Sequence, residues 1–167
     1  FQELRHMLRQ ALFEIPGPVA IRYPRGGEGA YKEDLSSQVV ARLRQGEDLT
    51  LLGYGVMINH LLEAAELLEK QGIHAGVVKL NRISPLDYEA IGPELGAVDT
   101  LLVAEDSFGA GCVGQLAEQG KAPRKLILKN LGKTYAPEGS VPQLEHSFGL
   151  DAQGIVTAVL EAREHEQ

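Results

Sequence analysis

Hydrophobic residues along most of the chain alternate between short continuous apolar runs and longer stretches with helical spacing. The apolar runs typical of buried strands are residues 50–54, 75–80, 100–104 and 125–131. The stretches between them that place their apolar residues on one side of a helix are residues 56–70, 86–95 and 113–119. Strands of five or six residues joined by such helices favour a mostly parallel sheet with right-handed crossovers. The pattern therefore predicts an α/β fold.

Further elements are predicted at both ends of this alternating region. The segment 38–43 is compatible with an added edge strand, including an antiparallel one. Beyond the last strand, Ser140 to Gln143 resembles the start of a helix, and Asp151 can cap a final helix that runs through Ala162.

The first residues follow a different pattern. Residues 1–15 predict an amphipathic helix, and residues 19–21 predict a short strand that leads into a basic turn. The polar segment 28–37 is typical of a linker. Because the chain opens on Phe1 inside the helical pattern, we interpret it as a fragment of a longer protein. We predict the remnant of a preceding domain at 1–27, a linker at 28–37 and one domain at 38–167.

Composition narrows the class of protein. Of the 167 residues, 44% are hydrophobic and 23% are charged, and the formal net charge is −7. This balance indicates a globular protein and argues against nucleic acid as a partner. The sequence has no apolar run near the roughly 20 residues that span a bilayer, so no membrane is expected. The single cysteine, Cys112, excludes an intrachain disulfide, and we expect a cytoplasmic location.

A glycine-rich stretch, Gly109 to Gly114, matches the G-x-G-x-x-G pattern of dinucleotide sites. Its context argues against that role, because it follows a late strand and stands beside the carboxylates Glu105 and Asp106. We expect the glycines to permit close helix–sheet packing instead. For Glu105 and Asp106, a role in acid–base catalysis is the weaker alternative to a structural role. We predict that Asp106 or Ser107 caps the following turn and that Glu105 pairs across a subunit interface.

The basic turn offers a candidate anion site. Arg22 and Arg25 flank Tyr23–Pro24, and a guanidinium on a rigid turn suits the capture of a phosphate. An ordinary solvated or salt-bridged arginine explains the local sequence equally well. Cys112 has no adjacent base that would make it a nucleophile, and the five histidines lack metal-ligand spacing, so no catalytic or metal-binding residue is predicted.

Several motifs together resemble one family. These are the segment from Gly17 to Gly26, Ser84-Pro85-Leu86-Asp87, Leu101 to Asp106 with the following glycines, Pro137-Glu138-Gly139, and the tail from Phe148 to Ile155. In this order they are similar to the C-terminal part of transketolase-type thiamine-diphosphate enzymes, above all the 1-deoxy-D-xylulose-5-phosphate synthases. The resemblance covers essentially the whole chain.

The resemblance implies a three-layer α/β/α domain with a mixed five-stranded sheet, preceded by the end of a pyrimidine-binding domain. It implies the condensation of pyruvate with glyceraldehyde 3-phosphate to 1-deoxyxylulose 5-phosphate with loss of CO₂. Thiamine diphosphate and Mg²⁺ would be bound by domains that this chain lacks, so the fragment would be inactive alone, bind no cofactor and supply homodimer contacts. Arg25 matches the arginine that binds the phosphate of glyceraldehyde 3-phosphate. Arg22 is carried over as a second candidate substrate-binding residue.

One departure from the family and three alternatives stay open. The family's Arg-Phe-x-x-Pro-Leu-Asp is here Asn81-Arg82-Ile83-Ser84-Pro85-Leu86-Asp87, so the arginine is displaced by one position and would point to the opposite side of a strand. A 2-oxoacid dehydrogenase β subunit would share the architecture. A flavodoxin-like binding module, or a pure dimerisation module, would also satisfy the α/β alternation.

Overall fold

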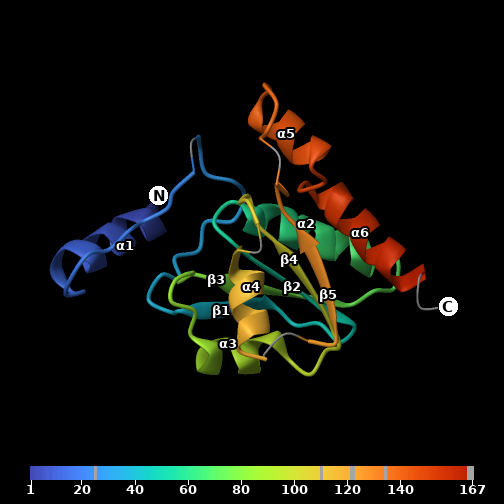
Figure 1. Ribbon diagram of the computed structural model, residues 1–167, viewed down its shortest axis with the longest axis horizontal. Helices are drawn as coiled ribbons and strands as arrows, with labels where there is room; N and C mark the ends of the chain where they lie inside the picture. The colour runs from blue at the N-terminus through green and yellow to red at the C-terminus, as the bar shows by residue number, and fades with distance from the viewer. Residues whose placement is uncertain (25, 110, 121–122, 134, 165–167) are drawn as a thin grey trace.

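The computed structural model describes residues 1–24, 26–109, 111–120, 123–133 and 135–164. Its centre is a five-stranded sheet with the strand order β1-β3-β2-β4-β5 (Figure 1). The strands are β1 (Val40–Arg44), β2 (Leu49–Tyr54), β3 (Ala75–Leu80), β4 (Thr100–Ala104) and β5 (Lys125–Lys129). Strand β1 runs antiparallel to β3, and the other three pairs are parallel. The predicted mixed sheet, including its antiparallel edge strand, is confirmed.

Helices cover both faces of the sheet. Helices α2 (Met57–Glu69) and α6 (Ala152–Glu164) share one buried apolar cluster with the sheet, which includes Leu51 and Leu102. Helices α3 (Tyr88–Leu95) and α4 (Gly111–Glu118) share the other, which includes Leu52 and Val103. Neighbouring residues of one strand thus enter opposite clusters, as the alternation of side chains in a strand requires. The three-layer α/β/α architecture is confirmed.

The C-terminal helices begin where the sequence provides caps. Ser140 and Gln143 form a capping box at the start of α5 (Val141–Ser147). Asp151 accepts the backbone N–H of Gly154 at 2.8 Å and so caps the first turn of α6, as predicted.

The N-terminal segment lies to one side of this domain. Helix α1 (Gln2–Phe13) stands apart from the sheet in Figure 1, and none of its residues is buried. The strand predicted at 19–21 is not formed; this stretch is an irregular segment in which Val19 is 41% exposed. A strand needs a neighbouring strand to pair with, and the sheet described here ends at β1 and β5. Residues 19–21 pair with neither of these edge strands, so the apolar run stays irregular.

Candidate functional site

The carboxyl edge of strands β2 and β4 is the position at which this fold brings functional side chains together. These strands are parallel neighbours at the centre of the sheet, and the chain leaves β2 toward β3 on one side before returning to β4 on the other. Such a reversal of strand order creates a crevice at the carboxyl ends, where α/β proteins place ligands. Tyr54 is the last residue of β2 and Glu105 directly follows β4.

Glu105 is the buried centre of this edge. Glu105 is only 1% exposed. Its Oε2 accepts hydrogen bonds from Tyr54 Oη at 3.2 Å and from Cys112 N–H at 3.1 Å. The Ser107 hydroxyl lies 3.4 Å from the same oxygen. The other oxygen, Oε1, has no hydrogen-bond partner among the residues that the structure describes. The carboxylate therefore caps the first turn of α4 from within the domain.

This arrangement corrects two predictions and explains the glycines. The cap was expected from Asp106 or Ser107, and Glu105 was expected at a subunit interface, whereas Glu105 is buried by its own chain and supplies the cap itself. Gly111 has a φ of +45°, and a Cβ at this position would overlap the Glu105 carboxylate. The glycine is thus required so that the carboxylate can approach the helix, which agrees with the packing role predicted for the glycine stretch.

Arg22 ties the N-terminal segment to this edge. Its Nη2 donates to the backbone oxygen of Asp106 at 2.7 Å and lies 3.0 Å from the Asp106 carboxylate. Its Nη1 donates to Tyr54 Oη at 3.3 Å, and the guanidinium lies 5.7 Å from the centroid of the Tyr54 ring. Burial raises the pKa of Asp106, and the nearby Arg22 charge acts in the opposite direction. Desolvation raises the pKa of Tyr54 to about 12.

The predicted site residues therefore have different outcomes. Arg22 lies in contact with Asp106, and this contact occupies part of its guanidinium, while its role toward a substrate stays a prediction. Arg25 lies outside the described residues. Tyr54 was missed, although its place at the carboxyl end of a predicted strand was a usable signal. Arg82 is exposed, and Asn81 stands where the family arginine was expected.

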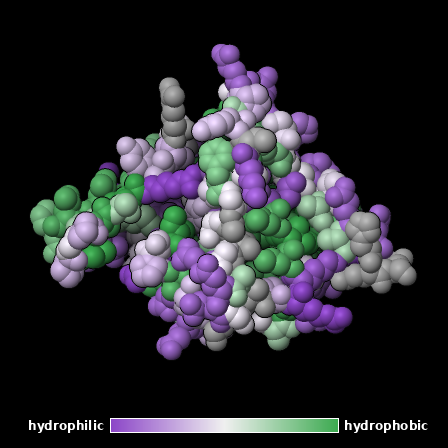
Figure 2. Space-filling view, in the orientation of Figure 1, coloured by the Kyte–Doolittle hydropathy of each residue, from purple (hydrophilic) through white to green (hydrophobic). Residues whose placement is uncertain are grey.

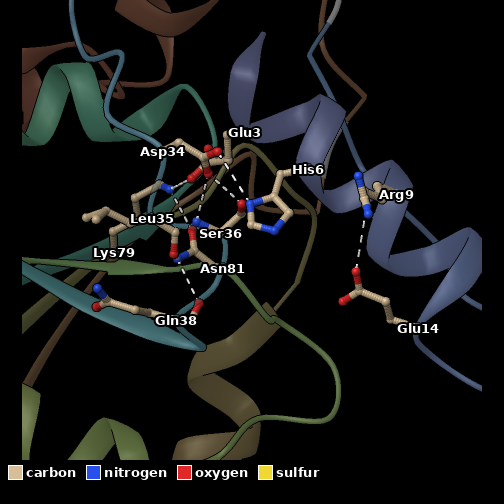
Figure 3. Close-up of polar contacts among 10 residues, drawn as sticks. All are labelled: Glu3, His6, Arg9, Glu14, Asp34, Leu35, Ser36, Gln38, Lys79 and Asn81. Carbon is tan, nitrogen blue, oxygen red and sulfur yellow. Dashed lines mark hydrogen bonds and ion pairs between the residues drawn. The ribbon is translucent and has the colours of Figure 1, made fainter.

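A second polar cluster lies where α1 meets the domain (Figure 3). Its centre is Lys79, a residue of β3 that is only 2% exposed and pairs with Glu3 and Asn81. Beside it, Asp34 lies 3.4 Å from His6 and accepts hydrogen bonds from the Ser36 hydroxyl and backbone N–H, which hold the pKa of Asp34 below its usual range. Sequence reasoning missed Lys79 as well. A single charge within an otherwise apolar strand was the signal.

The donor chemistry of the described residues does not fit a metal ion or a diphosphate. No group of three or more histidine, cysteine, aspartate or glutamate residues could hold a metal ion within the described part of the chain. In the glycine stretch, the Cys112 N–H is already bound by the Glu105 carboxylate, and this negative group would repel a diphosphate. A search of the described helices also finds none that is long and apolar enough to cross a membrane.

Comparison with known proteins identifies the domain. Residues 38–155 match the family described as "Transketolase, C-terminal domain". The chain is 37% identical to a 1-deoxy-D-xylulose-5-phosphate synthase of Chlorobaculum tepidum, over 96% of this chain and 27% of that protein. It is 36% identical to the synthase of Heliobacterium modesticaldum, over 95% of this chain and 26% of that protein. The chain thus spans about a quarter of the length of these curated relatives.

A solved structure shows the same fold. It is named "Split gene transketolase, inactive beta4 tetramer", and it matches 84% of this chain and 45% of its own with a TM-score of 0.63 and 24% sequence identity. The family match over residues 38–155 argues against the flavodoxin-like alternative. The resemblance predicted from the motifs is confirmed, and the chain belongs to the transketolase C-terminal domain family.

Proposed function

We propose that this chain is the C-terminal part of a 1-deoxy-D-xylulose-5-phosphate synthase, a transferase that condenses pyruvate with glyceraldehyde 3-phosphate and releases CO₂. The observation that carries the proposal is the identity of 37% over 96% of the chain to a protein of that name. The same proposal accounts for the motif order, including the Arg22-Tyr23-Pro24-Arg25-Gly26 turn. The same identity favours this synthase over a 2-oxoacid dehydrogenase β subunit.

The proposed division of labour within such an enzyme rests on the chemistry of the described residues. The synthase family implies thiamine diphosphate and Mg²⁺, and the described residues fit neither group, since they offer no acidic cluster and their glycine stretch is occupied by Glu105. We assign cofactor binding to other parts of the parent protein. The role proposed for residues 38–167 is to support those parts and to contribute contacts to a homodimer in the cytoplasm. On this proposal the chain alone is inactive.

Within this chain, we propose that Arg25 binds the phosphate of the acceptor. A guanidinium can hold a phosphate through two parallel hydrogen bonds, and the adjacent Pro24 and Gly26 suit a defined turn. The attachment of Arg22 to Asp106 supports the proposal, because it fixes the start of the same turn at the carboxyl edge of the sheet. Arg22 would then act by holding the turn, with direct substrate contact as the alternative.

The experiment compares two acceptors in the full-length parent protein. Glyceraldehyde 3-phosphate and unphosphorylated glyceraldehyde differ by the group that Arg25 is proposed to bind. We expect Arg25→Ala to raise the KM for the phosphorylated acceptor by about 100-fold, since a charge-assisted hydrogen bond contributes roughly 1.5–3 kcal/mol. Its kcat/KM for glyceraldehyde should be unchanged. Arg124→Ala, at an exposed arginine elsewhere, is the matched control.

Each outcome assigns a different conclusion. Equal losses with both acceptors would make Arg25 a structural residue of the turn. A folded, cofactor-loaded parent that forms no deoxyxylulose phosphate from pyruvate and either acceptor would contradict the proposed reaction and place the chain in another transketolase-like enzyme.

A further inference from the structure

Lys79 is a lysine in the interior of the fold. It lies on β3 between Val78 and Leu80, which are both part of a buried apolar cluster, and it is paired in register with Gly53 of β2 and Ala41 of β1. Only 2% of Lys79 is exposed. A buried ammonium group is strongly unfavourable unless a negative charge and hydrogen-bond acceptors surround it. The partners of Lys79 must therefore be held firmly in place.

The negative partner comes from outside the domain. The Lys79 ammonium forms an ion pair with Glu3 of α1 and donates to Asn81 Oδ1 at 2.5 Å (Figure 3). The ammonium also lies over the face of the Tyr31 ring, 5.5 Å from the ring centroid. A cation is attracted to this face of an aromatic ring. Asn81 is fixed in turn, because its amide nitrogen donates to the Leu35 oxygen at 2.7 Å. The site for the ammonium is thus preformed except for Glu3.

Apolar packing contributes little to the placement of α1. No residue of α1 is buried, and Leu12 and Phe13 are 72% and 80% exposed. Figure 2 shows hydrophobic residues gathered on the outer surface over this helix. Polar contacts remain as the main attachment, namely the Glu3–Lys79 pair and the His6–Asp34 contact of 3.4 Å. The position of α1 therefore depends on charge.

The Glu3–Lys79 pair and the Arg22–Asp106 pair hold the same segment at the same edge of the sheet. Lys79 is the register partner of Gly53, and the next residue of β2 is Tyr54, which Arg22 contacts. Residues 3–22 are therefore anchored at both ends across the neighbouring strands β3, β2 and β4. The turn that follows Arg22 is the turn proposed above to bind the acceptor phosphate.

We propose that Lys79 is a positioning residue for this turn. Through its ion pair with Glu3 it holds α1 and the following segment against the domain, and so keeps Arg22, at the start of the turn, at the carboxyl edge of the sheet. Lys79 acts through Glu3 and does not contact the substrate. The part of this inference that concerns the acceptor rests on the proposed function, whereas the part that concerns α1 does not.

The test is a charge swap in the full-length parent protein. Glu3→Lys and Lys79→Glu each place like charges together, and the double variant restores an ion pair with its direction reversed. Amide hydrogen exchange of residues 2–13 measures the docking of α1 without any need for activity. We expect each single variant to exchange about tenfold faster or more in this helix, and the double variant to return toward the parent rate. Lys70→Glu, at an exposed lysine, controls for the change in net charge.

Kinetics with glyceraldehyde 3-phosphate test the second part. Each single variant should raise the KM for glyceraldehyde 3-phosphate by about tenfold while kcat stays the same, and the swap should reverse the change. Exchange rates that respond to the swap without any change in KM would overturn the positioning role and leave the ion pair as a docking contact. Single variants with parental exchange, or a folded double variant that shows no recovery, would overturn the inference as a whole. If Lys79→Glu does not fold alone, folding of the double variant supports the pair, and its failure overturns it.

Discussion

At the scale of single residues, two separate features of the structure require a glycine at position 111. Its φ of +45° disfavours any side chain, and a Cβ would overlap the Glu105 carboxylate that caps α4. We expect Gly111→Ala to lower the free energy of unfolding by about 3 kcal/mol or more, because the carboxylate must move away from its buried donors. Urea unfolding followed by circular dichroism measures the loss.

Gly109 provides the matched comparison for this substitution. Its φ is +73°, and a Cβ there would meet open space. Gly109→Ala should therefore cost only the strain of a left-handed residue, about 1–2 kcal/mol. Equal losses at the two positions would show that the Glu105 carboxylate does not need the space beside Gly111.

Tyr54 gives a prediction for pH dependence. Burial raises its pKa to about 12 in the folded protein, above the ordinary value of 10.0, so the folded state keeps a proton that the unfolded state loses. The stability from this difference is complete below pH 10 and is lost as the pH rises toward 12. The slope is about 1.4 kcal/mol per pH unit for one proton.

The variant Tyr54→Phe removes this titration. It loses the hydrogen bonds to Glu105 and from Arg22, so it should be less stable than the parent at pH 9, and the gap should narrow as the pH rises to 11. Urea midpoints at several pH values measure the gap, and Tyr135→Phe controls for the loss of one tyrosine at an exposed ring. A stability difference between the two proteins that stays constant from pH 9 to pH 11 would contradict the raised pKa of the buried Tyr54 phenol.

The residues of the candidate site could be predicted singly but not as pairs. The sequence pointed to Arg22, Glu105 and Asp106, because charged residues at strand ends and glycine turns are recognisable locally. The contact of Arg22 with Asp106 joins residues 84 positions apart, and no local pattern encodes it. Lys79 was passed over because an apolar strand pattern tolerates a single charge. Only the docked α1 shows how that charge is compensated.

At the scale of elements, periodicity predicted most of the domain. Strands β3 and β4 have the predicted bounds, and α2 begins and ends one residue inside the predicted stretch. These elements are buried in the sheet or against it, so their apolar spacing is dictated by the core. The exception is informative. The run at 19–21 has strand-like composition, but strand formation depends on a partner, and composition cannot supply one.

At the scale of the whole molecule, the two apolar clusters and the N-terminal segment differ in what holds them. The buried members of both clusters all lie between Val40 and Val159. The segment 1–27 is attached by polar contacts, and the Arg22–Asp106 pair is about half exposed. Exposed ion pairs contribute only about 0–1 kcal/mol each. Folding of the domain should therefore depend little on this segment.

Deletion of residues 1–27 tests this separation. We expect the shortened protein to unfold cooperatively, with a free energy of unfolding within about 1 kcal/mol of the longer chain, because water replaces Glu3 as the partner of the Lys79 charge once α1 is gone. Leu61→Ala in the full chain should cost about 2–5 kcal/mol, because Leu61 is a fully buried residue of α2, and it calibrates the measurement. A deletion as costly as Leu61→Ala would make residues 1–27 part of the cooperative unit of the domain. A deletion without cost would mean that α1 adds nothing to the stability of this fold, so that the Glu3–Lys79 pair serves to place the segment.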